Sequence, residues 1–98
     1  MTGIIWGYTE ETAKNKLKEI EENYKLYHTA EILIRRKNEI IFNNGDRWIA
    51  SGARESSRGR RCNISYIDRR IEQDFIDTVI KHCTTAGPYH AFNYYFTE

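Results

Sequence analysis

The sequence predicts a small α+β or α/β domain with one central mixed sheet and two helices, in the order β-α-β-β-β-β-α-β. Three features indicate this fold class. Two stretches carry apolar residues at helical spacing, several short apolar runs end in turn residues, and an Asn-Gly pair separates two of those runs. The 98 residues, 40% of them hydrophobic, suit one hydrophobic core, so we expect residues 1–98 to form a single domain.

The first predicted elements are a strand and an amphipathic helix. Residues 3–8 are a short apolar run bounded by glycine, which is typical of a strand. Thr9 is a favourable N-cap, and Glu10 and Glu11 suit the positive end of a helix dipole. The helix is predicted over about residues 10–25, from apolar side chains at steps of three and four: Ala13, Leu17, Ile20, Tyr24 and Tyr27.

Three more strands and a loop follow this helix. Residues 29–35, 39–42 and 47–50 are predicted strands, because each contains a short run of apolar side chains. Asn44-Gly45 lies between the last two strands and predicts a tight hairpin turn with positive φ at both residues. Residues 51–61 contain two glycines, three serines and four arginines, which predicts a loop.

The last elements are a strand, a helix and an aromatic strand. Residues 62–67 alternate between polar and apolar side chains, which predicts a strand that ends at Asp68. A helix is expected over residues 69–83, from a wide apolar face formed by Ile71, Phe75, Ile76, Val79, Ile80 and Cys83. Gly87-Pro88 stops that helix, and residues 90–96 form the expected final strand.

The formal net charge of +1 hides an uneven distribution. Between Arg47 and Arg70 there are seven arginines and two acids, so this stretch carries +5. It contains no lysine, and the planar guanidinium fork of Arg suits phosphate and carboxylate groups. No apolar run approaches the roughly 20 residues that span a bilayer, no secretory signal is recognisable, and the two cysteines cannot form a disulfide framework. We therefore expect a protein of the reducing cytoplasm without a membrane partner.

Two groups of residues are candidates for function. Four arginines of the predicted loop are the expected nucleic-acid or phosphate-binding residues: Arg54, Arg58, Arg60 and Arg61. A solvated basic loop without a ligand is the alternative. Asp68, at the carboxyl end of an apolar strand, lies where an α/β sheet binds ligands and could hold Mg²⁺. Its alternative role is the N-cap of the helix that follows.

The run from Glu39 to Asp68 resembles the middle of the ATPase domain of phage large terminase subunits, the DNA-packaging motors. Three motifs carry the resemblance: the I-x-F-x-N-G hairpin at residues 40–45, the R-G-x-R loop at residues 58–61, and the apolar strand that ends in the Walker B aspartate at Asp68. Residues 4–9 and the following helix resemble the second strand and helix of that fold. The resemblance covers about residues 3–83.

Three parts of the terminase pattern are missing. The sequence contains no G-x-x-x-x-G-K-[ST] loop to cradle phosphates, and Arg69 stands where the catalytic glutamate is expected. The chain is also too short for the nuclease domain. The resemblance therefore implies a phage-encoded, non-enzymatic protein of the host cytoplasm without a cofactor, in which Mg²⁺ and ATP would bind only if another chain completed the site.

Three functional interpretations follow. The first is a protein that binds nucleic acid or phosphate groups through the arginine-rich loop. The second is a protein-interaction module, such as an anti-defence inhibitor or decoy of a host or phage protein, whose C-terminal strand adds to a partner's sheet or pairs two copies. The third is one fragment of a split terminase. Five aromatic residues, Trp6, Trp48, Tyr94, Tyr95 and Phe96, could stack on bases beside the loop, although packing in a small core is the favoured role.

Overall fold

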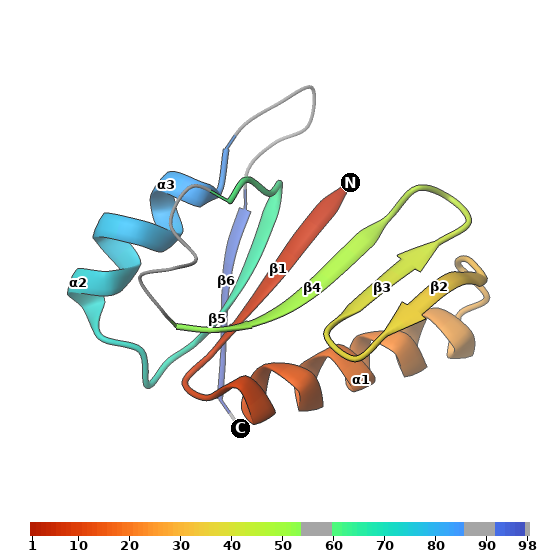
Figure 1. Ribbon diagram of the computed structural model, residues 1–98, viewed down its shortest axis with the longest axis horizontal. Helices are drawn as coiled ribbons and strands as arrows, with labels where there is room; N and C mark the ends of the chain where they lie inside the picture. Colours follow the sequence, from red (N-terminus) through yellow and green to blue (C-terminus); the bar gives the residue numbers. More distant parts are fainter. Residues whose placement is uncertain (54–59, 86–91, 98) are drawn as a thin grey trace.

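A computed structural model describes residues 1–53, 60–85 and 92–97 of the chain (Figure 1). It confirms the predicted order of elements: one mixed sheet of six strands with two helical segments. The elements are β1 (Thr2–Gly7), α1 (Glu10–Leu26), β2 (Ile32–Arg36), β3 (Glu39–Phe42), β4 (Arg47–Gly52), β5 (Ile64–Asp68), α2 (Gln73–Phe75), the π-helical segment η2 (Ile76–Ile80), α3 (Lys81–Cys83) and β6 (Phe92–Phe96).

The strands lie in the order β2-β3-β4-β1-β5-β6. β1 is parallel to both of its neighbours, β4 and β5, and β5 is parallel to β6. β3 is antiparallel to both β2 and β4. The carboxyl ends of the four parallel strands therefore meet at one edge of the sheet, where β1 ends at Gly7 and β5 ends at Asp68.

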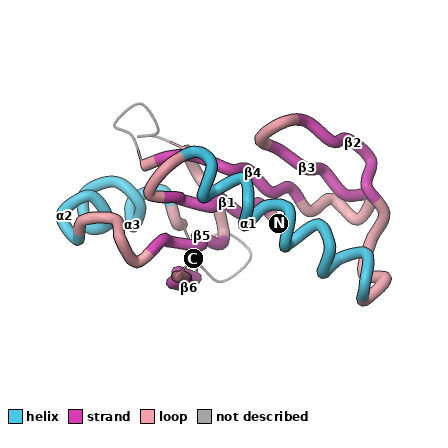
Figure 2. The backbone as a smooth tube through the Cα atoms, turned by 90° about the horizontal axis from the view of Figure 1, so that it is seen from below, coloured by secondary structure: helices cyan, strands magenta, loops and turns pink. Residues whose placement is uncertain are grey.

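β1 is the central strand, and its side chains alternate between two hydrophobic clusters. Ile4 and Trp6 pack with residues of α2, η2 and α3, whereas Ile5 packs with residues of α1. All three are fully buried, as expected for a strand that is covered on both faces. The two helical segments therefore lie on opposite faces of the sheet. Figure 2 shows them apart, with α2 and α3 at the left and α1 running to the right beneath β3 and β2.

α1 begins where the sequence predicts it. The Thr9 hydroxyl accepts a hydrogen bond from the Thr12 amide, which confirms Thr9 as the N-cap. Its apolar stripe buries Ala13, Leu17 and Ile20 against the sheet. Among the described residues, no helix is both long enough and apolar enough to cross a membrane.

The hairpin between β3 and β4 is present, but its turn differs from the prediction. Gly45 has φ of 94°, whereas Asn44 does not have positive φ. The Gly45 amide bonds the Phe42 carbonyl at 3.1 Å, and the Phe42 amide bonds the Asp46 carbonyl at 2.8 Å. These bonds close a three-residue loop, in which only the last residue needs the left-handed conformation.

The second helical segment begins later than predicted. It starts at Gln73 with Glu72 at the N-cap position, so Asp68 is not its cap. Asp68 instead accepts a hydrogen bond from the Arg70 amide at 3.0 Å, which forms a tight turn after β5. Other boundaries also differ. β2 begins at Ile32 and β5 at Ile64, both later than predicted. β4 extends through Gly52 into the predicted loop, and the described part of the last strand begins at Phe92.

The close contact of β1 with β4 gives a testable prediction about Gly3. A Cβ atom at Gly3 would overlap the ring of the buried Trp48, whose indole N–H is also held by the Tyr24 hydroxyl. We expect Gly3→Ala to lower the free energy of unfolding by about 1–3 kcal/mol, the usual cost of overpacking. Denaturant titration measures the change. Lys18→Ala on the exposed side of α1 is the control, with an expected effect within about 0.5 kcal/mol. An equal effect of both variants would contradict the close packing.

Candidate functional site

Asp68 lies at the carboxyl edge of the sheet and is fully buried. Its Oδ2 accepts hydrogen bonds from the Tyr8 amide at 3.1 Å and from Arg70 Nη2 at 2.7 Å. Its Oδ1 accepts from the Arg70 amide and from Arg70 Nε. Arg70 also donates to the Thr12 hydroxyl and lies over the Tyr8 ring. Asp68 and Arg70 therefore join the end of β5 to the end of β1 and the start of α1.

This environment determines what Asp68 can do. Burial disfavours its charged form, but the hydrogen bonds from Arg70 and the Tyr8 amide outweigh burial and hold the pKa of Asp68 below its ordinary value. The carboxylate is therefore ionised and already neutralised by a guanidinium. Mg²⁺ prefers several oxygen ligands, but the neighbours of Asp68 are mainly N–H donors, so these residues do not fit the ion. Among the described residues, no three His, Cys, Asp or Glu side chains are grouped to hold a metal.

A second site lies on the face of the sheet opposite α1. Here the part of the chain that the structure describes places no helix over β3 and β4, and a cleft of about 610 Å³ is present. Its floor includes Ile4 and Ile49, which are paired in neighbouring strands. Five cationic side chains and one carboxylate line this basic cleft: Arg36, Lys37, Arg47, Arg60, Arg61 and Glu39. The excess of positive charge makes the basic cleft a candidate site for anions.

Glu39 organises two of these cations. It is only 8% exposed and receives hydrogen bonds from Arg36 Nη1, at 2.7 Å, and from Arg47 Nε. Burial opposes ionisation of Glu39, but these two guanidinium groups outweigh it and lower the pKa of the carboxyl. Glu39 therefore stays charged at neutral pH and fixes the positions of two arginines whose side chains are 62% and 49% exposed. A ligand would meet guanidinium groups that are already ordered.

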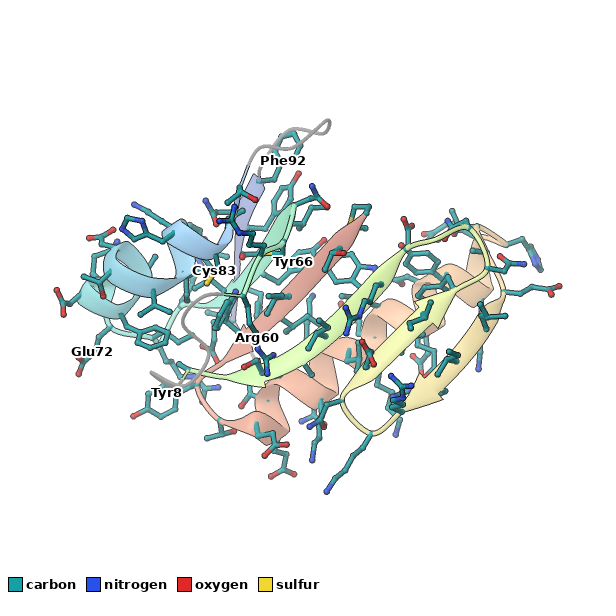
Figure 3. The ribbon with its side chains drawn as sticks, turned by 45° about the horizontal axis from the view of Figure 1, so that its top comes forward. Tyr8, Arg60, Tyr66, Glu72, Cys83 and Phe92 are labelled. Carbon is teal, nitrogen blue, oxygen red and sulfur yellow. The ribbon has the colours of Figure 1, made fainter. Side chains whose placement is uncertain are left out.

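The structure brings together two of the four arginines that the sequence predicts as binding residues. Arg60 and Arg61 are exposed, line the basic cleft, and form no ion pair with any described residue. Figure 3 shows the Arg60 side chain lying over the sheet at β4. The other two, Arg54 and Arg58, lie outside the described residues.

Sequence reasoning missed Arg36 and Lys37 as members of this site. Arg36 ends β2 and Lys37 follows it, 24 residues before Arg60 and Arg61, and the sequence alone gives no reason to join the two segments. The strand order brings them together, because β3 pairs with both β2 and β4 and so folds the β2–β3 turn beside Ile49. One signal was present: three adjacent cations at residues 35–37, where one predicted strand ends and shortly before the next begins.

The aromatic residues divide into buried and exposed groups. Trp6 is fully buried and Trp48 is 4% exposed, so neither can stack on a base, and both have the packing role that the sequence favours. Tyr94 and Tyr95 are 45% and 40% exposed. Tyr94 packs against Tyr66 on the side of the sheet that carries α1, opposite the basic cleft. The Tyr94 ring and the basic cleft therefore lie on opposite faces of the sheet.

A cleft of about 660 Å³ lies beside the end of α1 and β2. Its two formally charged lining residues, Lys25 and Glu31, have opposite signs. The basic cleft is therefore the stronger candidate for an anion.

No protein-family model matches the chain, and no curated protein matches it. The candidate site therefore rests on the geometry and charge described above.

The buried Asp68–Arg70 pair predicts a change in stability. Because the folded pKa of Asp68 lies below the unfolded value of about 3.9, the ionised carboxylate stabilises the fold above about pH 4. This contribution disappears as the pH falls through the folded pKa. We expect Asp68→Asn to lower the free energy of unfolding at pH 7 by about 1.5–3 kcal/mol, the range for hydrogen bonds to charged groups.

Unfolding by guanidinium chloride at pH 7 and pH 3 measures this effect. The difference in unfolding free energy between Asp68→Asn and the wild type should be smaller at pH 3. Asp74→Asn, which changes an exposed aspartate of α2, is the matched control and should have little effect at either pH. A stability loss that is the same at both pH values would show that the charge of Asp68 is not responsible.

Proposed function

We propose that the protein binds nucleic acid through phosphate groups in the basic cleft. One observation carries this proposal: five cationic side chains and a single carboxylate line an open cleft on a part of the sheet over which the described residues place no helix. Two of the cations, Arg60 and Arg61, have no acidic partner among the described residues. Such cations can neutralise phosphates, and the release of the counterions condensed on the nucleic acid then drives binding.

The identity of the cations favours phosphate over other anions. Four of the five are arginines, whose planar fork can contact two phosphate oxygens at once. They come from three separate segments, at the end of β2, the start of β4 and the approach to β5, so they are spread over a surface. A spread of cations matches a chain of phosphates better than one small anion.

A non-enzymatic role for a terminase-like fold is part of the proposal. Two features near Asp68 support it. The carboxylate that would hold Mg²⁺ in an ATPase is occupied by Arg70, and Arg69, at the position of the catalytic glutamate, lies over the Tyr95 ring. A guanidinium cannot act as the base that orients an attacking water. Nucleic-acid binding without hydrolysis is therefore the activity that these residues favour.

The proposal predicts salt-dependent binding that depends on Arg60 and Arg61. A fluorescein-labelled 20-base-pair duplex and a single strand of equal length are titrated with protein at several salt concentrations, and anisotropy is measured. We expect log K to fall linearly with log salt concentration. The double variant Arg60→Gln/Arg61→Gln should weaken binding and reduce the duplex slope by up to about 2, because each lost phosphate contact removes about 0.9.

The matched control is Lys14→Gln/Lys18→Gln, which removes the same charge from α1 on the opposite face. If both double variants weaken binding equally, the protein responds to net charge alone and the basic cleft is not the site. If the wild type binds neither probe at low salt, the proposed function is wrong.

A further inference from the structure

The two outer strands of the sheet are protected very differently against pairing with other strands. β2 carries a register shift between Ile32 and Ile34 and ends in Arg35 and Arg36. A bulge and edge charges are the usual devices that prevent edge-to-edge association. β6, with the sequence FNYYF, has no charge, no proline and no register shift in its pairing with β5. Among the described residues, no strand pairs with its outer side.

The backbone of β6 presents a defined set of groups on this outer side. The Phe92 amide bonds the Asn63 carbonyl at 2.9 Å, and the Phe96 carbonyl accepts from the Arg69 amide at 2.9 Å, so both residues turn their backbone groups toward β5. Backbone groups of successive residues in a strand point to alternate sides. The amides and carbonyls of Asn93 and Tyr95 therefore point outward, away from the sheet.

The strand is nearly palindromic about Tyr94. In an antiparallel pair of two β6 strands centred on Tyr94, Asn93 of one copy lies opposite Tyr95 of the other, and Phe92 lies opposite Phe96. Asn93 and Tyr95 are the two outward-facing residues, so each such pair can exchange two hydrogen bonds. The side-chain pairs on the α1 face are then all aromatic, and none brings like charges together.

We propose that β6 pairs with β6 of a second copy of this chain, antiparallel and centred on Tyr94, about a two-fold axis perpendicular to the sheet. This symmetry is isologous, so the same patch serves both copies. Burial of side chains that are now 44%, 45% and 40% exposed, those of Phe92, Tyr94 and Tyr95, adds to the four backbone hydrogen bonds. Figure 3 shows Phe92 at the upper end of β6, away from Arg60.

A charge-exchange experiment tests this pairing. At the two-fold axis, Tyr94 faces Tyr94 of the second copy, so Tyr94→Lys or Tyr94→Glu places like charges opposite each other. We expect each variant alone to self-associate at least about tenfold more weakly than the wild type in analytical ultracentrifugation. An equimolar mixture of the two variants should restore the dimer, because lysine then faces glutamate.

Leu33→Lys is the matched control, since it places the same charge on the exposed face of β2 and should leave self-association unchanged. Circular dichroism of each variant verifies its fold. As a measurement that needs no variant, amide exchange of Asn93 and Tyr95 in the wild type should slow as concentration rises.

Three results would each overturn the proposal. The first is a wild type that remains monomeric up to about 0.5 mM, a concentration that reveals Kd values near the millimolar range. The second is a mixture of folded variants that does not associate, which would point to a strand from a different protein as the occupant. The third is an equal effect of Leu33→Lys, which would indicate nonspecific association.

Discussion

β1 must be buried on both faces, and the arrangement of the other elements depends on this constraint. Its side chains alternate between two hydrophobic clusters, so one helical segment has to lie on each face. Both of its neighbours are parallel to it, which requires long connections instead of hairpins. Gly3 and Gly7 leave room for the Trp48 ring and the backbone at the start of α1. The position of β1 thereby fixes where the helices, the hairpin and β5 can lie.

Within residues 1–53, 60–85 and 92–97, this arrangement leaves two diagonally opposed parts of the sheet without a helix. α1 packs on β1 and β4 on one face, and the segment from α2 to α3 packs near β1 and β5 on the other. The uncovered part over β3 and β4 carries the cations of the basic cleft. The uncovered part at β5 and β6 carries exposed aromatic side chains. The two proposed activities therefore use different parts of the sheet, the face over β3 and β4 and the edge at β6.

The sequence predicts local features better than it predicts how they assemble. Periodicity and capping locate α1, because the Thr9 cap and the apolar stripe of the helix both depend on residues that are close in sequence. The start of the second helix is missed, because Asp68 accepts a hydrogen bond from the Arg70 amide in a tight turn and does not cap the helix. Contacts of Asp68 with Tyr8 and of Arg70 with Thr12, about 60 positions away, accompany this turn, and the local sequence does not reveal them. The same limit applies to the basic cleft. The excess of arginine predicts Arg60 and Arg61 as candidate binding residues. Only the pairing of β3 with β2 and β4 adds Arg36 to the basic cleft and places Glu39 between two guanidinium groups.

The order of strands along the chain also has a consequence for folding during synthesis. β1 is made first, yet its partners β4 and β5 are made much later, with Gly3 pairing to Trp48 and Ile64. α1 and the β2–β3 hairpin rely on local contacts and can form while the ribosome is still extending the chain. The central strand has no neighbour until β4 emerges and only one until β5 follows. Closing these long loops costs entropy, so we expect formation of the central sheet to be the slow step of folding.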